Sequence, residues 1–415
     1  MDPWKLPPIV GEVTDNKASV LFQLYDLSSQ VTYQVNNKIH KVIVEPSGPT
    51  NIIINLKKSG TFVVKWIIDN HLYYQHQIVN EPISRLIFVS CDFVEADTPN
   101  SLWTKMLDDI VGKTVIVHLG DQIYGDPVFN QCKKLLTNLT DFNTQQQCFD
   151  LYGDRCCETW KPHCQVLSNT SNYYVWDDHE IYNDIQLNTM HDPTTKKIIN
   201  VAVNAYNQYQ QSFHIDHDFM INDYCWYKYI NNNTILLTIE RTSRDVELEE
   251  IFEAIMNFDV DHLILCFTSA PIPTPHGFNG NLYKSLKGLG KFWPEDQLIL
   301  LYQWLFKWMT MKKKVVVVGG DVHFGVYGHM TKDDLSIPVI IASPITNQPY
   351  LDRQLAAKGM RGTHLLADMT FTTTISKARR CYATLDMDTM AIRMVYSQDK
   401  YPKNKIKYIK KLLQF

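Results

Sequence analysis

A run of four valines at 315–318 is the strongest hydrophobic pattern in the chain. Two glycines follow it directly, and after them come Asp321 and His323. A short, continuous apolar run of this kind is typical of a central strand that is buried on both faces. The pattern therefore predicts a strand that presents an aspartate and a histidine just beyond its carboxyl end.

Three further apolar runs end in the same way. They are residues 86–90, followed by Cys91 and Asp92; residues 114–120, followed by Asp121 and Tyr124; and residues 173–176, followed by Asp177, Asp178, His179 and Glu180. Open α/β sheets bind their ligands at the carboxyl ends of their strands. We therefore expect these polar side chains to gather at one edge of a sheet.

The spacing of the apolar runs changes near residue 84. Before this point, short runs rich in β-branched and aromatic residues recur about every ten residues, separated by Asn, Gly and Pro. This spacing predicts a small all-β domain of immunoglobulin-like type at residues 1–83. Beyond it, strand and helix patterns alternate, which predicts a layered α/β domain with parallel strand pairs at residues 84–415. Helices are expected at 99–110 and 293–309.

The predicted α/β domain carries an insert and a basic tail. The insert, residues 127–170, holds five of the nine cysteines. Reduced thiols are the preferred interpretation, followed by disulfides and then by a small zinc site with His163. The tail, residues 400–415, intersperses lysines with apolar residues. It predicts a C-terminal helix that packs on the body, and the alternative is a short basic helix at a membrane surface.

Composition narrows the class of protein. A chain of 415 residues, 45% hydrophobic and 20% charged, can build a sizeable core and is long enough for two domains. The net charge of −4 gives no reason to expect a nucleic-acid partner. The sequence shows neither a signal-peptide pattern at its start nor an apolar run of about 20 residues, so we expect a cytoplasmic protein.

Aspartate, histidine, tyrosine and cysteine at strand ends are side chains that bind metal ions. Carboxylates can bridge two ions, of which one activates a water molecule and the other polarises a phosphoryl oxygen, and this favours phosphate ester hydrolysis. Asp121 is the best bridging candidate, Tyr124 suits a ferric ion as a phenolate, and Cys91 binds as a thiolate. Each residue alone also fits a turn or a core position. The three acids within 177–180, however, would repel one another without a cation.

Four segments together carry a resemblance to a known family. They are residues 90–92, 118–124, 176–181 and 319–323. In this order they resemble the signature of the PhoD-like metallophosphatases, a branch of the calcineurin-like and purple-acid-phosphatase superfamily. The resemblance implies a four-layer αββα metallophosphatase sandwich, preceded by a small β domain. The loop 342–346 also resembles a family loop beside the site, with no ligand role.

The resemblance also implies a set of metal ligands. Those that would hold an iron ion, Fe3+, are Cys91, Asp121, Tyr124 and His323. Those that would hold a divalent ion, calcium in the alkaline phosphatase branch, are Asp121, Asp178 and Asp321. Asp92, beside the cysteine, is a further candidate ligand.

Two catalytic roles and a function follow from the same resemblance. His179 would lie near the phosphate as transition-state stabiliser or leaving-group acid. Arg241 and Arg244 resemble the family's arginine-bearing segment and would bind phosphate oxygens; the alternative is a surface ion pair with Asp245 or Glu247. The expected function is hydrolysis of a small-molecule or lipid phosphate ester by attack of a metal-bound hydroxide. The alternative is a catalytically inactive metallophosphatase scaffold that acts as a binding or docking protein.

Overall fold

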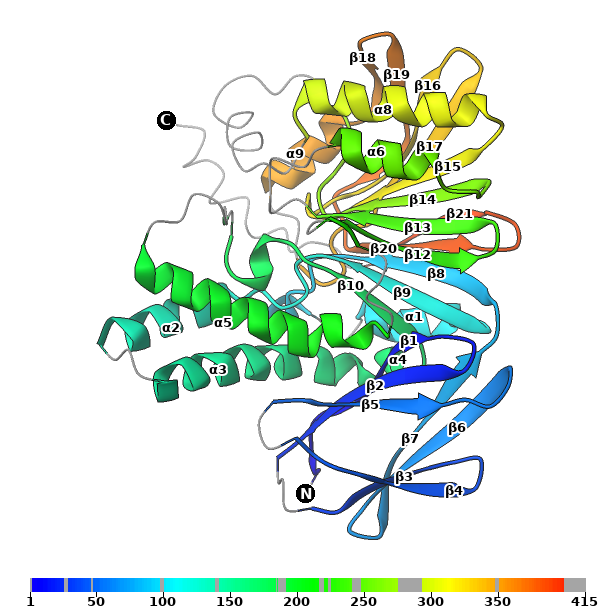
Figure 1. The fold of residues 1–415 in the computed structure, drawn as a ribbon. Coiled ribbons are helices and arrows are strands. Elements are labelled where there is room, and N and C mark those ends of the chain that lie inside the picture. Colours follow the sequence, from blue (N-terminus) through cyan, green and yellow to red (C-terminus); the bar gives the residue numbers. More distant parts are fainter. Residues whose placement is uncertain are drawn as a thin grey trace.

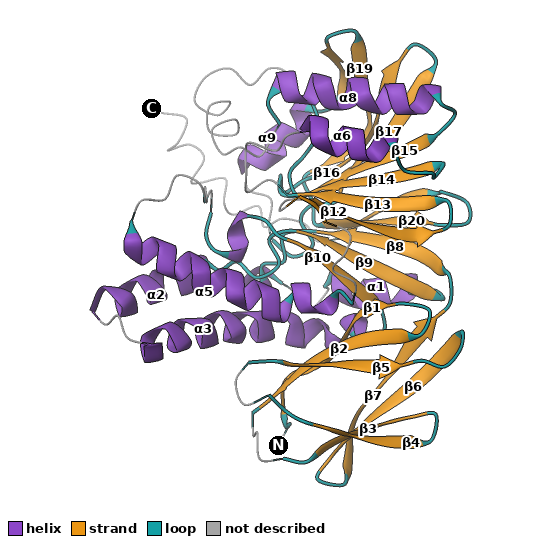
Figure 2. Ribbon diagram, in the orientation of Figure 1, coloured by secondary structure: helices purple, strands orange, loops and turns teal. Residues whose placement is uncertain are grey.

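The computed structural model describes residues 2–25, 29–45, 48–97, 101–138, 142–183, 185, 192–215, 220–222, 225–240, 248–274, 293–347 and 351–398. Within these ranges the strands form four sheets, with helices at their flanks (Figure 1, Figure 2). The predicted mixed α/β class is confirmed. The immunoglobulin-like type of the N-terminal part and the αββα layering remain predictions.

Two small sheets form the N-terminal part of the molecule, at the bottom of Figure 1. The first has the order β1 (Trp4–Val13), β2 (Lys17–Leu24), β5 (Thr50–Asn55), and the second the order β4 (Lys38–Val42), β3 (Val31–Val35), β6 (Gly60–Ile68), β7 (His71–Asn80). One buried core joins them. In it, Trp4 packs edge to face against Phe22 and Trp66, with ring centroids 5.6 and 6.0 Å apart. Residues of β6 alternate between this core and the exposed face, as the period of a strand requires.

A five-stranded sheet carries three of the four polar strand ends. Its order is β10 (Ser171–Val175), β9 (Lys113–Leu119), β8 (Ile83–Val89), β20 (Cys381–Asp386), β21 (Ile392–Tyr396). The strands β8, β9 and β10 are parallel, with Val89 opposite His118 and Leu119 opposite Val175. Their carboxyl ends therefore lie at the same edge of the sheet.

The fourth strand end belongs to a second sheet of nine strands. Its order is β11 (Met220–Asn222), β12 (Cys225–Asn231), β13 (Thr234–Ile239), β14 (His262–Phe267), β15 (Lys314–Gly319), β17 (Leu335–Ile341), β16 (Gly325–Lys332), β19 (Met369–Lys377), β18 (Gly362–Leu366). The valine run lies in β15, between the parallel strands β14 and β17. The expectation of a single sheet edge was therefore wrong, because hydrophobic patterning identifies strands but does not say which strands pair.

The two large sheets pack against each other through one buried cluster. This cluster contains Leu86 and Val117 of the five-stranded sheet and Ile264 and Val318 of the nine-stranded sheet. Leu265, next to Ile264, belongs to a different cluster, because successive residues of a strand point to opposite faces.

Helices flank both large sheets, and apolar clusters join them to the strands (Figure 2). Those on the nine-stranded sheet are α6 (Leu248–Met256), α8 (Glu295–Thr310) and α9 (Leu351–Gly359). Those on the five-stranded sheet are α1 (Leu102–Met106), α2 (Asp126–Asn138), α3 (Phe142–Trp160), α4 (Cys164–Leu167) and α5 (Pro193–Tyr209). The helix predicted at 293–309 is α8, and that predicted at 99–110 is the shorter α1 followed by a 3-10 turn.

The predicted insert is mostly helical, since it contains nearly all of α2 together with α3 and α4. All nine cysteines lie in the described part of the chain and are free thiols. The predicted tail, 400–415, lies outside the described residues. Among the helices that are described, none combines the length and the apolar character needed to cross a membrane.

A buried ion pair joins β1 to the nine-stranded sheet. The ammonium of Lys228 lies 3.0 Å from the carboxylate of Glu12, and only 7% and 6% of the two side chains are exposed.

Lys228→Met leaves a buried carboxylate without this cation, so the free energy of unfolding in urea should fall by about 3–5 kcal/mol. Glu12→Gln in the same chain should recover most of the loss. Lys5→Met, in a more exposed pair with Asp154, should cost less than about 1 kcal/mol, and equal losses at the two sites would contradict this account.

His76 is buried where β7 meets the segment after α4. The indole N–H of Trp66 donates to Nε2 of His76 at 3.0 Å, and Nδ1 lies 2.7 Å from the carbonyl oxygen of Ser168. Burial lowers the pKa of His76 from 6.5 to about 4.

The pH dependence of stability follows from this shift. Between pH 6.5 and about 4 the unfolded chain binds a proton at His76 that the native chain does not, so this contribution to stability is present above pH 6.5 and is lost as pH falls. Its full size is about 3 kcal/mol. His76→Gln should reduce the slope of unfolding free energy against pH in this window, as measured by urea denaturation. An unchanged slope would contradict the prediction.

Candidate metal centre

The four polar strand ends meet at one place. Cys91 follows β8, Asp121 and Tyr124 follow β9, Asp178 and His179 follow β10, and Asp321 and His323 follow β15. Backbone hydrogen bonds join the first two turns: the amide of Cys91 donates to the carbonyl of Gly120 at 3.2 Å, and that of Asp92 to the carbonyl of Asp121 at 2.8 Å. The turns of neighbouring strands thus continue the pairing of the sheet beyond its regular edge.

Two groups of metal-ligating side chains result. The first contains Cys91, Asp121, Asp321 and His323, and the second contains Asp121, Asp178 and His179. In each group the ligand atoms lie within 4.8 Å of one another, and every member is buried. Asp121 belongs to both groups, so its carboxylate lies between the two sets of donors.

The backbone at five of these positions adopts an unusual conformation. The φ angle is +58° at Cys91, +58° at Asp121, +45° at Tyr124, +60° at Asp321 and +56° at His323. Non-glycine residues seldom adopt the left-handed region, and those that do cluster at active sites and ligand-binding sites. Each turn therefore holds its side chain in a direction that an ordinary strand end would not give.

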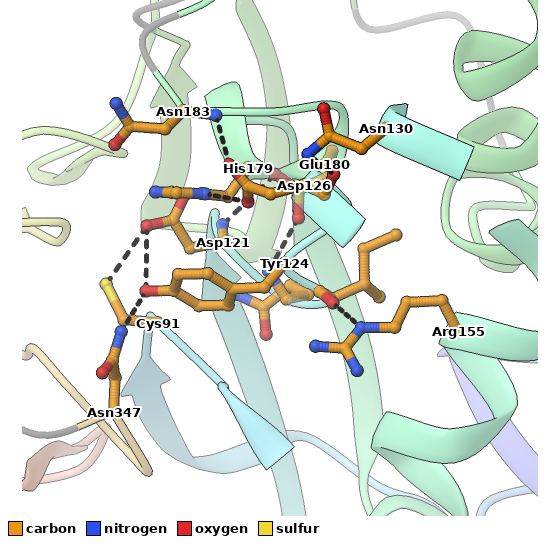
Figure 3. A network of polar contacts seen from close by, with 12 residues as sticks. Cys91, Asp121, Tyr124, Asp126, Asn130, Arg155, His179, Glu180, Asn183 and Asn347 are labelled. Carbon is orange, nitrogen blue, oxygen red and sulfur yellow. Dashed lines mark hydrogen bonds and ion pairs between the residues drawn. The ribbon is translucent and has the colours of Figure 1, made fainter. Parts of the chain in front are cut away.

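Tyr124 completes the first group (Figure 3). Its hydroxyl lies 3.1 Å from Nε2 of His323 and 3.5 Å from Oδ2 of Asp121. The side-chain amide of Asn347 donates to the same hydroxyl at 2.8 Å. The phenol oxygen thus faces the centre of the donor group.

Close approach of the two sheets brings the donors together. A side chain at Gly320, just after β15, would place its Cβ 2.8 Å from the carbonyl oxygens of Leu119 and Thr268. Leu119 ends β9 of the other sheet, and Thr268 follows β14. Glycine is required at this position because any larger residue would separate Asp321 from Asp121.

Burial and neighbouring charge oppose ionisation of the donors. Burial raises the pKa of the Cys91 thiol well above its usual range, and the carboxylates of Asp121 and Asp321 raise it further. The pKa of Tyr124 is raised for the same reasons, burial first. A metal cation reverses both effects, because it stabilises the thiolate and phenolate that bind it. The donor set, with thiol, phenol, imidazole and carboxylates, therefore fits a metal ion.

His179 is held by a carboxylate outside the two groups. Its Nδ1 lies 2.7 Å from Oδ2 of Asp126, whose other oxygen accepts from the backbone N–H of Asn183 at 2.9 Å. Since Nδ1 contacts Asp126, Nε2 is the ring nitrogen that is left to interact with the group of Asp121 and Asp178. Burial alone lowers the pKa of His179, but the negative charge of Asp121 and the hydrogen bond to Asp126 outweigh burial and raise it to about 10. The contact with Asp126 thus orients the imidazole.

Glu180 fastens the turn after β9 to the turn after β10. Its buried carboxylate accepts from the backbone N–H groups of Asp121 at 3.2 Å, Gln122 at 2.7 Å and Asp177 at 2.9 Å. Burial raises the pKa of Glu180 to about 8. Three donors converging on one side chain fix the position of Asp121 relative to Asp178.

Asp92, a predicted ligand, lies apart from these groups. Asp92 is buried but belongs to neither group, and its Oδ1 accepts from Trp103 at 3.3 Å and from Thr346 at 3.0 Å. Arg241 lies outside the described residues. His163, the candidate for a zinc site, stacks on Trp103 with ring centroids 4.8 Å apart and is in neither metal-ligating group.

The structure adds contacts around the metal-ligating groups from residues to which the sequence gave no separate role. These residues are Asp126, Glu180, Ser343 and Asn347. The sequence did point to Asp126 and Glu180, because Glu180 lies within the segment 176–181 and Asp126 lies just beyond the segment 118–124. Ser343 lies in the loop 342–346, for which the resemblance gave no role, and Asn347 follows directly. The hydrogen bonds of this loop cross long sequence separations, so the sequence could not reveal them.

Together, the fold and the site define an α/β protein that gathers metal-ligating side chains at the carboxyl ends of strands from two packed sheets. Among solved structures, the one titled "Structure of PhoD" is similar to this chain, with a TM-score of 0.62 and a sequence identity of 13%. The match covers 100% of this chain and 98% of the PhoD chain. The chain therefore has a PhoD-like fold, as its motifs predicted.

Similarity to other solved structures is much lower. Beta-glucuronidase 2 of Bacteroides uniformis is 8% identical to this chain, with a TM-score of 0.23, and the match covers 76% of this chain and 40% of the beta-glucuronidase. No protein-family model matches the sequence, and no curated protein matches it significantly.

Substitution of Glu180 tests its role. Glu180→Gln exchanges an acceptor oxygen for an N–H donor, so the free energy of unfolding should fall by about 1–3 kcal/mol. Binding of added Fe3+ or Ca2+, measured by dialysis and elemental mass spectrometry, should weaken by about 10- to 100-fold. Glu253→Gln, the same change at an exposed position of α6, should alter neither quantity. Unchanged metal binding in Glu180→Gln would show that the hydrogen bonds from Glu180 to the turns after β9 and β10 are not needed for the metal site.

Proposed function

We propose that the protein is a metal-dependent phosphoesterase with a PhoD-like fold. The observation that carries the proposal is the position of Asp121, whose carboxylate belongs to both donor groups. A carboxylate in such a position can bridge two metal ions about 3.5–4 Å apart. Paired ions of this kind serve the hydrolysis of phosphate esters.

The donor chemistry supports two different ions. The residues that would hold an iron ion, Fe3+, are Cys91, Asp121, Tyr124 and His323. Asp121 and Asp178 would hold a divalent ion through oxygen atoms, and calcium suits such ligands. Asp321 was expected with the divalent ion, but it lies in the group of Cys91 and His323, so it is a candidate for either ion. When bound, the ions would supply the Lewis acidity that activates water and polarises the phosphoryl oxygens.

The chain's own residues would orient the substrate and supply a proton. The contact with Asp126 fixes the ring of His179, so that Nε2 can donate to a phosphate oxygen or to the leaving group. We assign this role to His179. Arg241 is proposed to bind phosphate oxygens. The substrate is proposed to be a small-molecule or lipid phosphate ester.

The same proposal includes the division of the chain. We assign residues 1–83 to an immunoglobulin-like β domain and residues 84–415 to an αββα metallophosphatase domain that contains the insert 127–170. The apolar cluster between the two large sheets and the helices on their outer faces support the layering. The shared core of the two N-terminal sheets supports the separate β domain.

Asp121→Asn tests the function directly. The purified chain, supplied with Fe3+ and Ca2+, should hydrolyse p-nitrophenyl phosphate or bis(p-nitrophenyl) phosphate. The variant should lose about 100-fold or more of the rate, because one carboxylate charge serves both ions. Asp334→Asn, an identical change in the exposed β16–β17 turn, should keep full activity. Failure of the metal-supplied wild-type chain to hydrolyse monoesters, diesters and phospholipid headgroups would overturn the proposal.

A further inference from the structure

The loop between β17 and α9, residues 342–347, fastens the first donor group from one side. The hydroxyl of Ser343 accepts from the backbone N–H of His323 at 3.0 Å and lies 3.3 Å from the sulfur of Cys91. The Ser343 O–H can donate to the sulfur while its oxygen accepts from His323. The backbone N–H of Asn347 donates to the carbonyl of Cys91 at 3.3 Å. The loop thus accepts a hydrogen bond from the backbone of His323 and contacts both the sulfur and the backbone carbonyl of Cys91.

The loop also contacts a third metal-ligating residue, Tyr124, through the side chain of Asn347. Its amide nitrogen donates to the hydroxyl oxygen of Tyr124 at 2.8 Å, and the residue is 5% exposed (Figure 3). An amide N–H can only donate, so the phenol oxygen accepts. A tyrosine that binds a metal ion has lost its hydroxyl proton, and a donor is then the only compatible neighbour at this distance. The orientation of Asn347 therefore suits a phenolate.

We propose that Asn347 is a positioning residue that directs the Tyr124 oxygen into the donor group and, by its hydrogen bond, sets how strongly that oxygen donates to a bound ferric ion. This inference rests on the proposed function, because it assumes that Tyr124 binds iron. Hydrogen bonds to a metal ligand orient the ligand and tune its donor strength. A hydrogen bond to a phenolate lowers the energy of the electrons that the oxygen shares with iron.

The colour of the iron-loaded protein reports this effect. A phenolate bound to Fe3+ absorbs visible light by transferring an electron from oxygen to iron. When the hydrogen bond is removed, the donating electrons rise in energy and the band moves to longer wavelength. A role of Asn347 confined to holding the loop would leave the wavelength unchanged, because the backbone contact between Asn347 and Cys91 does not involve the side chain.

The test uses the full chain loaded with Fe3+, with absorption spectra and iron content measured together. Asn347→Leu keeps a similar volume but has no donor, and Asn347→Asp places a carboxylate oxygen where the amide nitrogen lies. Both variants should move the band to longer wavelength, because the hydrogen bond is lost. They should also weaken iron binding by about 10- to 100-fold, because the Tyr124 oxygen is no longer held in position. Thr346→Val is the matched control, because its hydroxyl donates to Asp92, which lies outside both donor groups. This control should keep the wild-type wavelength.

The outcomes separate this inference from the proposed function. Tyr124→Phe should abolish the band, which assigns the band to that phenolate. A wild-type chain that binds iron and shows the band, together with Asn347 variants of unchanged wavelength and affinity, would overturn the role of Asn347 alone. A wild-type chain that binds no iron would overturn the metal centre itself, and the role of Asn347 with it. If Asn347→Leu fails to fold, Asn347→Asp decides the question.

Discussion

Cys91, Asp121, Tyr124 and Asp321 bring up to four negative charges into a volume that water scarcely reaches. Charges placed in this way repel one another, and only protonation or a cation relieves the repulsion. Burial first, and then the neighbouring negative groups, raise the pKa of the Cys91 thiol and of the Tyr124 phenol. The arrangement is therefore best understood as a site shaped for positive charge. Asp121, which lies between both groups of donors, is its centre.

The frame around the donors keeps them close despite this repulsion. Five donors have positive φ angles, a conformation that costs on the order of 1–3 kcal/mol per residue and persists only where the surrounding structure imposes it. Glu180 binds the turns of β9 and β10 together, and the loop 342–347 closes on the turns of β8 and β15. The buried cluster between the two sheets stabilises all of these turns from below. The free energy cost of the positive φ angles is thus offset by the packing of the two large sheets.

Hydrophobic patterning alone predicted much of this arrangement. The apolar runs before Cys91, Asp121, Asp178 and Asp321 are strands, and their polar ends do meet. The sequence could not show that β15 lies in a different sheet from β8, β9 and β10, because pairing depends on contacts between distant segments. It also missed Asn347, which approaches Tyr124 across 223 residues of sequence. The position of Asp92 outside both groups likewise depends on tertiary contacts with Trp103 and Thr346 rather than on the motif.

The measurement that most directly tests the central claim is an anomalous difference map from crystals grown with Fe3+ and Ca2+ and recorded at the iron absorption edge. The account predicts one strong iron peak within bonding distance of Cys91, Asp121, Tyr124 and His323, and density for a second ion on the Asp178 side of Asp121. No iron peak, or a peak bound elsewhere while these side chains keep the mutual hydrogen bonds described above, would contradict it.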